Sequence, residues 1–475
     1  MSTTTAGHAQ GFATLTEEVA LERLPLRGAL PGWLEGTLLR TGPAQWEVGA
    51  STLTHWFDGL AMLHSFSFAD GEVSYASRFL QSRTRQAAEA AGRQVMGEFA
   101  TDPCRSIFQR VHALFRPQAT DNGNVNVAQL GERFVALTET PMAVEFDPAT
   151  LATLGFPRWA PGHVTTAHPH ADRDSGEAIN YVTRLGPRAT YHVYGLASPG
   201  GRPRPIATVA ARPPAYMHSF GLSERHVVLA EFPLVLRPLA LALGRAPFAD
   251  CFAWQPSRGT TFTVLDRRDG SLRGRFRGEP LFAFHHVNAF EDGDGRLVVD
   301  LCAYADASIV RSLYLDRLRG EAPVGAGVPD AFLTRVEIDL DGGAVTTRRL
   351  SEAPLELPRI NYGAVNERPY RWAWGAARGA DAPPGTFIDT LVKVDVESGA
   401  TTTWSEPGCW PGEPVFVAAP ARAAEDDGVC LSVVLDGAAG RSFLLVLDAA
   451  GFTELARAEV PHHIPFGFHG QFARA

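Results

Sequence analysis

A short phrase that recurs along the chain constrains its fold more than any other feature. In each copy an alternating apolar run leads into an aspartate, and a turn and a second strand-like run follow, as in Thr263-Val264-Leu265-Asp266. The copies end at Asp147, Asp266, Asp339, Asp395 and Asp448. An aspartate side chain can accept hydrogen bonds from the turn backbone, and the glycines in several copies tolerate a positive φ. Each copy therefore predicts a β-hairpin.

The repeated hairpins favour a closed β architecture. Imperfect hairpin repeats tens of residues apart are typical of β-propeller blades, which protect their strand edges by radial repetition. Unequal intervals between the aspartates indicate insertions on one face. Because no linker, low-complexity tract or charge block divides the sequence, we expect one all-β propeller domain over 1–475, with helical and loop insertions forming a cap. The alternative is two unrelated β-sandwich domains.

The composition excludes several classes of protein. A hydrophobic content of 45% and a charged content of 20% are typical of a globular protein with an ample core, and the net charge of −9 argues against nucleic-acid binding. The five cysteines form no CxxC pair, and the first residues lack the pattern of a signal peptide. No apolar run reaches the ~18 residues of a membrane span. We therefore expect a cytoplasmic protein, or one peripheral on the inner face of a membrane.

Two insertions differ from the strand pattern, at 102–117 and 231–248. In the first, Asp102 and Pro103 open a helical pattern whose apolar positions include Ile107, Val111 and Phe115. The second contains the apolar stretch 232–243, which is too short to span a bilayer. Both segments are compatible with core helices or with a patch that dips into one leaflet.

Four histidines lie in distinctive phrases that are far apart in the sequence. They are His168 in Thr-Thr-Ala-His-Pro-His, His218 in Tyr-Met-His-Ser-Phe-Gly, His285 in Phe-His-His-Val-Asn, and His469 in Phe-Gly-Phe-His-Gly. No single helix or hairpin could bring them together. Because neutral imidazole is the commonest protein ligand for iron, zinc and copper, they are candidate metal ligands. The alternative for each is a hydrogen-bonded structural histidine.

The sequence resembles the carotenoid cleavage oxygenase family almost from end to end. The matching phrases, besides the four histidine phrases, are 36–43, 56–64, 137–140, 361–363, 412–416 and 466–472. This resemblance implies a seven-bladed propeller with one Fe(II) per chain on its axis, bound by His168, His218, His285 and His469. His285 is preferred to His286 because the family's ligand directly follows a phenylalanine.

The resemblance also implies carboxylates behind the ligands. The matching positions are Glu139, Glu356 and Glu413, which would accept the outer N–H of three rings, fix their tautomers and offset the metal charge. Three glutamates for four histidines leave one ligand without a partner, and we expect it to be His168. The remaining near matches, His64, His170, His286, His462 and His463, are expected to be structural or surface residues.

The activity that the resemblance implies is oxidative cleavage. An enzyme of this family uses O2 to split a conjugated C=C bond of a carotenoid or apocarotenoid into aldehydes, including 15,15′ central cleavage to retinal-type products. The metal and O2 carry the reaction, so no side chain is needed as acid, base or nucleophile. The alternatives are a stilbene-cleaving dioxygenase, a non-cleaving retinoid isomerase or carotenoid binder, and a metal-free propeller scaffold.

Local features favour a lipophilic polyene as the substrate. Stilbene cleavers of the family carry a lysine just before the first glutamate, whereas this chain has Thr138, expected near the open coordination site, and Lys393 is its only lysine. The segments 102–116 and 120–127 are similar to the animal carotene-cleaving and retinoid-isomerase branch, in which this region contributes to a membrane-facing surface. We therefore expect an apolar tunnel, to which the 28 phenylalanines can contribute, and peripheral membrane association.

Overall fold

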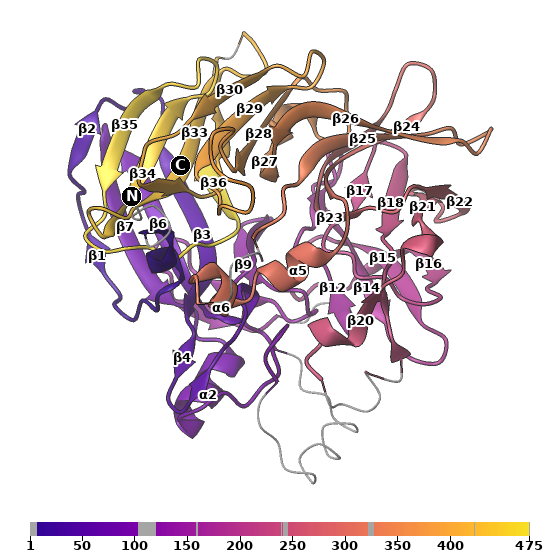
Figure 1. Ribbon diagram of the computed structural model, residues 1–475, viewed down its shortest axis with the longest axis horizontal. Coiled ribbons are helices and arrows are strands. Elements are labelled where there is room, and N and C mark those ends of the chain that lie inside the picture. Colours follow the sequence, from indigo (N-terminus) through magenta and orange to yellow (C-terminus); the bar gives the residue numbers. More distant parts are fainter. Residues whose placement is uncertain are drawn as a thin grey trace.

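Seven antiparallel sheets surround a common centre in the computed structural model (Figure 1). The structure describes residues 7–102, 120–157, 160–238, 240, 246–321, 327–421 and 423–474. The sheets have four to six strands each, and the few helices are short. The all-β, seven-bladed propeller predicted from the sequence is therefore confirmed.

The blades follow the chain in order, and the strands of each blade are named from the centre of the ring outward. Blade 1 contains β36 (Gly470–Arg474), β3 (Gly36–Gln45), β6 (Leu60–Ala69), β7 (Glu72–Phe79) and β1 (Ala20–Leu21). Blade 2 contains β8 (Asn126–Leu130), β9 (Arg133–Leu137), β10 (Val144–Phe146) and β11 (Thr153–Gly155). Blade 3 contains β12 (Val164–Thr165), β13 (His170–Ala171), β14 (Ala178–Arg184), β15 (Thr190–Leu196) and β16 (Arg204–Ala210). Blade 4 contains β17 (Gly221–Leu222), β18 (His226–Glu231), β21 (Thr260–Asp266) and β22 (Leu272–Gly278).

The remaining three blades complete the ring. Blade 5 contains β23 (Phe282–Glu291), β24 (Leu297–Tyr304), β25 (Phe332–Ile338) and β26 (Val345–Pro354). Blade 6 contains β27 (Glu356–Arg359), β28 (Trp372–Ala377), β29 (Thr390–Asp395) and β30 (Thr401–Trp404). Blade 7 contains β31 (Cys409–Pro411), β32 (Val415–Ala418), β33 (Gly428–Asp436), β34 (Arg441–Asp448), β35 (Glu454–Glu459) and β2 (Leu26–Gly28).

The five aspartate phrases each form the outer hairpin of a blade. In blade 4, Asp266 accepts a bond from the Arg268 backbone N–H at 2.9 Å, and its own carbonyl accepts from the Gly270 N–H at 2.9 Å. Gly270 has a φ of +72°, the left-handed conformation that glycine adopts readily. At each of the other four aspartates, the backbone carbonyl likewise accepts a hydrogen bond from the backbone N–H four residues later. The hairpins predicted from this phrase are confirmed.

Both faces of a blade are buried because neighbouring blades share their core. Leu38 and Phe66 of blade 1, for example, belong to one buried cluster with Leu431 and Val446 of blade 7. Strands covered on both sides contain nearly continuous apolar runs, as β33 and β34 do. This packing fixes the orientation of each blade against the next one.

The two ends of the described chain close the ring. The C-terminal strand β36 pairs with β3, with Gly470 opposite Arg40, and the N-terminal strand β2 pairs with β35, with Leu26 opposite Ala458. In Figure 1 the yellow C-terminal strands accordingly lie beside the indigo N-terminal strands. The position of β36, and of the histidine just before it, therefore depends on the first blade.

Short elements extend from the ring. They are β4 (Glu47–Val48), β5 (Ser51–Thr52), α2 (Arg83–Ala91), β19 (Leu234–Leu236), β20 (Phe252–Trp254), α5 (Ser308–Ser312), α6 (Leu315–Leu318), α7 (Tyr362–Val365) and the 3-10 turns η1 (His8–Phe12), η2 (Trp56–Asp58), η3 (Ala249–Cys251) and η4 (Pro256–Arg258). Figure 1 shows α2 and β4 below the ring of blades. Among the helices of the described ranges, none combines the length and apolar composition needed to cross a bilayer.

The two predicted apolar insertions have different outcomes. The helix expected at 102–117 lies, apart from Asp102, outside the described residues. In the second insertion, the helical interpretation is wrong at 234–236, where the chain forms strand β19 paired with β20. Phe232, Val235 and Leu236 are buried there, so the apolar side chains at the start of this stretch belong to the core. Contact of either insertion with a membrane stays a prediction.

Candidate metal centre

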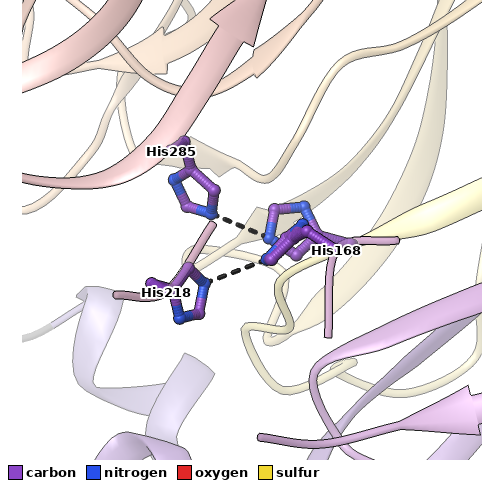
Figure 2. Close-up of side chains that lie close together, drawn as sticks. His168, His218 and His285 are labelled. Carbon is purple, nitrogen blue, oxygen red and sulfur yellow. Dashed lines mark hydrogen bonds between the residues drawn. The ribbon is translucent and has the colours of Figure 1, made fainter. Parts of the chain in front are cut away.

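The four predicted histidines meet at the centre of the propeller. His168 lies between β12 and β13, His218 just before β17, His285 on β23 and His469 just before β36. One ring nitrogen from each lies within 4.8 Å of all the others. Figure 2 shows the rings of His168, His218 and His285 pointing toward one another. The Nε2 atoms of His168 and His218 are 3.0 Å apart, as are those of His285 and His469.

The three predicted glutamates lie directly behind three of these rings. Glu139 is 2.7 Å from His218 Nδ1, Glu356 is 2.5 Å from His285 Nδ1, and Glu413 is 2.6 Å from His469 Nδ1. Within the described part of the chain, no carboxylate contacts His168. Each of the seven blades thus contributes one residue, a histidine or a glutamate, to the centre.

The hydrogen bonds show that this arrangement fits a cation. A carboxylate only accepts, so the Nδ1 atoms of His285 and His469 carry the proton and their Nε2 atoms present lone pairs. Two such lone pairs 3.0 Å apart repel each other unless a cation lies against both. Imidazole nitrogens bind transition-metal ions at about 2.0–2.1 Å, so two nitrogens at right angles on one ion lie about 3 Å apart. The donor set therefore fits a divalent transition metal.

Each glutamate has a second partner that the sequence analysis missed. The Tyr216 hydroxyl donates to Glu139 at 2.9 Å, and the Tyr304 hydroxyl donates to Glu356 at 3.0 Å. Burial raises the pKa of both tyrosines well above the usual value, so they remain donors. Tyr216 could have been found because it belongs to the His218 phrase. Tyr304 ends β24, and no pattern in the sequence marks it.

Glu413 is paired with a cation as well as with its histidine. The Arg359 Nε donates to Glu413 at 2.8 Å, and the Gly470 backbone N–H donates to the other carboxylate oxygen at 2.9 Å. Glu413 is 0% exposed, and burial alone would raise its pKa. Arg359 and His469 outweigh that effect and lower the pKa of Glu413 below its usual value. The carboxylate is therefore ionised throughout the neutral pH range.

The rings of His168 and His469 are neutral near pH 7. Burial lowers the pKa of His469 to about 4, although Glu413 opposes this shift. Burial, and then the neighbouring histidines, lower the pKa of His168 well below its usual value. Neutral imidazole is the form that binds metals.

The other histidines close to the matching phrases in the sequence form structural hydrogen bonds instead. His170 contacts the Phe220 carbonyl at 2.9 Å, His286 lies 2.7 Å from the Ser219 hydroxyl, and His64 bonds to the Tyr75 hydroxyl at 2.9 Å. None of them belongs to the group of four.

A cavity of about 790 Å³ opens onto His218, His285 and His469. Most of its wall is aromatic or aliphatic, and the insertions form part of it. The lining aromatic residues are Trp56, Phe57, Phe99, Phe248, Phe284, Tyr304, Phe387 and Phe468. Thr138, which is 9% exposed, also lines the cavity beside Glu139. The geometry is that of a metal centre at one side of an apolar tunnel.

Known proteins resemble this chain over nearly its whole length. The sequence model of the family described as "Retinal pigment epithelial membrane protein" matches residues 12–474. Carotenoid isomerooxygenase of Galleria mellonella is 38% identical over 94% of this chain and 92% of its own length. Beta,beta-carotene 15,15′-dioxygenase of Mus musculus is 35% identical over 96% and 90%.

Solved structures agree with these relatives. A variant of the apocarotenoid oxygenase of Synechocystis superposes with a TM-score of 0.87 at 26% identity, covering 98% of each chain. A cobalt-substituted form of the same enzyme gives a TM-score of 0.86, over 99% of this chain and 98% of that one. The fold and the sequence thus lead to the same group of proteins.

Proposed function

Because the chain belongs to the carotenoid oxygenase family, which includes retinal pigment epithelial membrane protein, we propose that it is an iron(II)-dependent oxygenase that cleaves a carotenoid or apocarotenoid. The observation that carries this proposal is the four-histidine cluster at the wall of an apolar cavity. A long polyene fits such a cavity, and the reacting double bond would lie against the metal.

One Fe(II) per chain would be held by His168, His218, His285 and His469. When bound, it supplies the activation of O2 that adds two oxygen atoms across a C=C bond and yields two carbonyl products. A solved relative is described as cobalt-substituted, which supports binding of a transition metal by this fold. Imidazole ligands suit iron well among the metals that this donor set fits.

The protein's own residues orient the ligands and exclude water. Glu139, Glu356 and Glu413 hold three rings in one tautomer and offset the charge of the ion. The phenylalanines of the cavity wall provide an apolar surface for the polyene and keep solvent away from the reacting bond. No side chain has to act as acid, base or nucleophile.

Central 15,15′ cleavage is the first position to test, because the mouse relative is named for it. Stilbene cleavage is disfavoured. Lys393 is buried, pairs with Asp426 at 2.5 Å and lies 4.0 Å from the ring centre of Trp372. It is absent from the described cavity wall, where Thr138 occupies the position of the stilbene cleavers' lysine.

A second activity is favoured by one observation. The relative at 38% identity is named an isomerooxygenase, so isomerisation of one product could accompany cleavage in this chain. Product geometry as well as product mass must therefore be measured.

The test is to load the protein anaerobically with Fe(II) and incubate it in air with β-carotene, apo-8′-carotenal and resveratrol. We expect about one iron per chain and aldehydes from the two polyenes, identified by mass, with chromatography against cis and trans standards. Aldehydes from resveratrol alone would shift the assignment to stilbene cleavage. A protein that retains no iron after reconstitution would contradict the proposal.

A further inference from the structure

One part of the cavity wall is polar without belonging to the four-histidine group. Glu98 and Thr120 line the cavity there. Phe57, whose ring centre is 6.4 Å from that of His218, packs against Phe99 at 5.4 Å, and Glu98 precedes Phe99 in the chain. Phe57 and Phe99 thus connect His218 to the segment that carries Glu98.

Two other buried carboxyl groups near Glu98 are already used by the fold. Asp58 accepts from the Ala100 backbone N–H at 3.0 Å and from the Thr101 hydroxyl at 2.5 Å. Asp121 accepts with one oxygen from the Thr84 backbone N–H at 2.8 Å and with the other from the first residue of α2 at 2.9 Å. Both oxygens of each aspartate are therefore occupied by loop and helix backbone or side-chain donors.

Glu98 differs from these two aspartates. Its Oε1 accepts from the Thr120 hydroxyl at 2.9 Å and from the Gln94 amide at 3.2 Å. Its Oε2 has no hydrogen-bond partner in the ranges that the structure describes, and the residue is only 7% exposed while it borders the cavity. Oε2 is not among the buried atoms that lack a partner, so it is open to the cavity, where a ligand can supply the missing bond.

We propose that Glu98 is a specificity-determining residue that binds the oxygenated end of the substrate, a ring hydroxyl or a carbonyl, through a hydrogen bond from Oε2. The inference rests on the proposed function, which supplies the polyene, and narrows it to a polyene with a polar terminus. A pure hydrocarbon ring would leave Oε2 unpaired.

The surroundings of Glu98 set its protonation state. Burial raises the pKa of its carboxyl well above the usual value, and the nearby Asp58 and Asp121 raise it further, against the opposing bonds from Thr120 and Gln94. A protonated carboxyl group has one O–H to donate. Since Oε1 already accepts two bonds, Oε2 is the oxygen that would carry this proton and donate it to an acceptor in the cavity. This neutral donor also avoids placing a charge in an apolar tunnel.

The test compares two substrates that share one polyene and differ in two ring hydroxyls, β-carotene and zeaxanthin. In Glu98→Leu, we expect the ratio of kcat/KM for zeaxanthin to that for β-carotene to fall about 10-fold relative to the wild type. Glu98→Gln keeps a donor at the same place, so its ratio should stay within about threefold of the wild type. Glu352→Leu, at an exposed glutamate of β26, is the matched control.

Binding to the metal-free proteins separates this inference from the proposed function. Tryptophan fluorescence quenching gives the Kd of each protein for zeaxanthin and for β-carotene. We expect the preference for zeaxanthin to be reduced in Glu98→Leu and to be retained in Glu98→Gln and Glu352→Leu. If the wild type binds both compounds but cleaves neither, the proposed function fails while the Kd ratio still decides the role of Glu98. Equal losses for both carotenoids in Glu98→Leu, or equal wild-type affinities, would overturn the inference. Glu98→Met replaces the leucine variant if that variant does not fold.

Discussion

Glu413 shares its carboxylate between His469 and Arg359, whereas Glu139 and Glu356 each receive a tyrosine hydroxyl. A neutral hydroxyl orients a carboxylate, but a guanidinium also lowers the free energy of its charged form. Arg359 therefore gives Glu413 a cationic partner, which neither tyrosine supplies to the other two glutamates. Replacing Glu413 with glutamine should therefore weaken its hydrogen bond to His469 and its ion pair with Arg359.

We expect Glu413→Gln to reduce iron affinity or kcat/KM by about 10–100-fold, the usual effect of removing a partner of a metal ligand. Arg359 and His469 both contact Oε1, and the Gly470 N–H donates to Oε2. The amide oxygen of glutamine carries no charge and replaces only one of these atoms, so the NH2 group opposes either the Gly470 N–H or the two donors at Oε1. Iron per chain and kcat/KM are the measurements. Glu406→Gln, which alters an ion pair with Arg457 in blade 7, is the control, and equal behaviour of the two variants would contradict this role.

His218→Ala and His469→Ala should each abolish iron retention, because each removes one of four donors from a buried centre. Metal analysis after anaerobic reconstitution gives the answer. His192→Ala serves as the control, since His192 bonds to Thr190 and Thr208 in blade 3. A full complement of iron in either ligand variant would show that the ligands lie elsewhere.

At the scale of single elements, β36 has two functions. It is the innermost strand of blade 1, and its first residue, Gly470, follows His469 and donates its N–H to Glu413. A Cβ atom on Gly470 would lie 2.8 Å from the Leu39 carbonyl oxygen and 2.6 Å from the Arg40 Cγ. The strand cannot accept that atom without moving away from β3.

We therefore expect Gly470→Ala to destabilise the protein by about 1–3 kcal/mol, as overpacking does, and to lower its iron content. Denaturant unfolding and metal analysis measure the two effects. Gly293→Ala places its Cβ in open space, with no heavy atom within 4 Å, and should change neither quantity. A Gly470→Ala protein as stable and as rich in iron as that control would refute the close contact.

The elements also show what the sequence could predict. The outer hairpins were predictable because their signals are local, an aspartate such as Asp266 and a glycine such as Gly270 within four residues of it. The strand at 234–236 was not, because a short apolar run has no periodicity that separates a helix from a buried strand. The contact of Tyr304 with Glu356 joins two separate strands, and no local pattern reveals such a pair.

For the whole molecule, buried neutral histidines predict sensitivity to acid. Burial lowers the pKa of His55 and His469 to about 4, and of His64 and His286 to about 3. In an unfolded chain these rings titrate near about 6.5. Between these values the unfolded state binds more protons, so stability falls as the pH falls from about 6.5 toward 4.

Thermal unfolding of the metal-free protein across this pH range tests the expectation. The melting temperature should fall steadily on acidification, and His286→Gln should make the slope shallower by removing one of the titrating rings. A melting temperature that stays constant from pH 6.5 to about 4.5 would contradict the argument.

Membrane association is also a property of the whole molecule, and it stays a prediction for the segment 102–117. Replacing Ile107, Val111 and Phe115 with serine should weaken co-sedimentation with liposomes, because insertion of apolar side chains drives such binding. Leu154→Ser is the control, since Leu154 is exposed on strand β11. If the triple variant binds liposomes as well as the wild type does, the membrane interpretation is contradicted and the segment is a core helix.

Drawing one residue from every blade makes the metal centre a property of the closed ring. A fragment that lacks any one blade lacks one residue of the centre or its support, so iron binding would require assembly of the whole ring. The outer hairpins and the cap, in contrast, contribute nothing to the coordination itself. Substitutions in loops such as the one that carries Glu98 would therefore change substrate specificity without altering the residues that bind the metal.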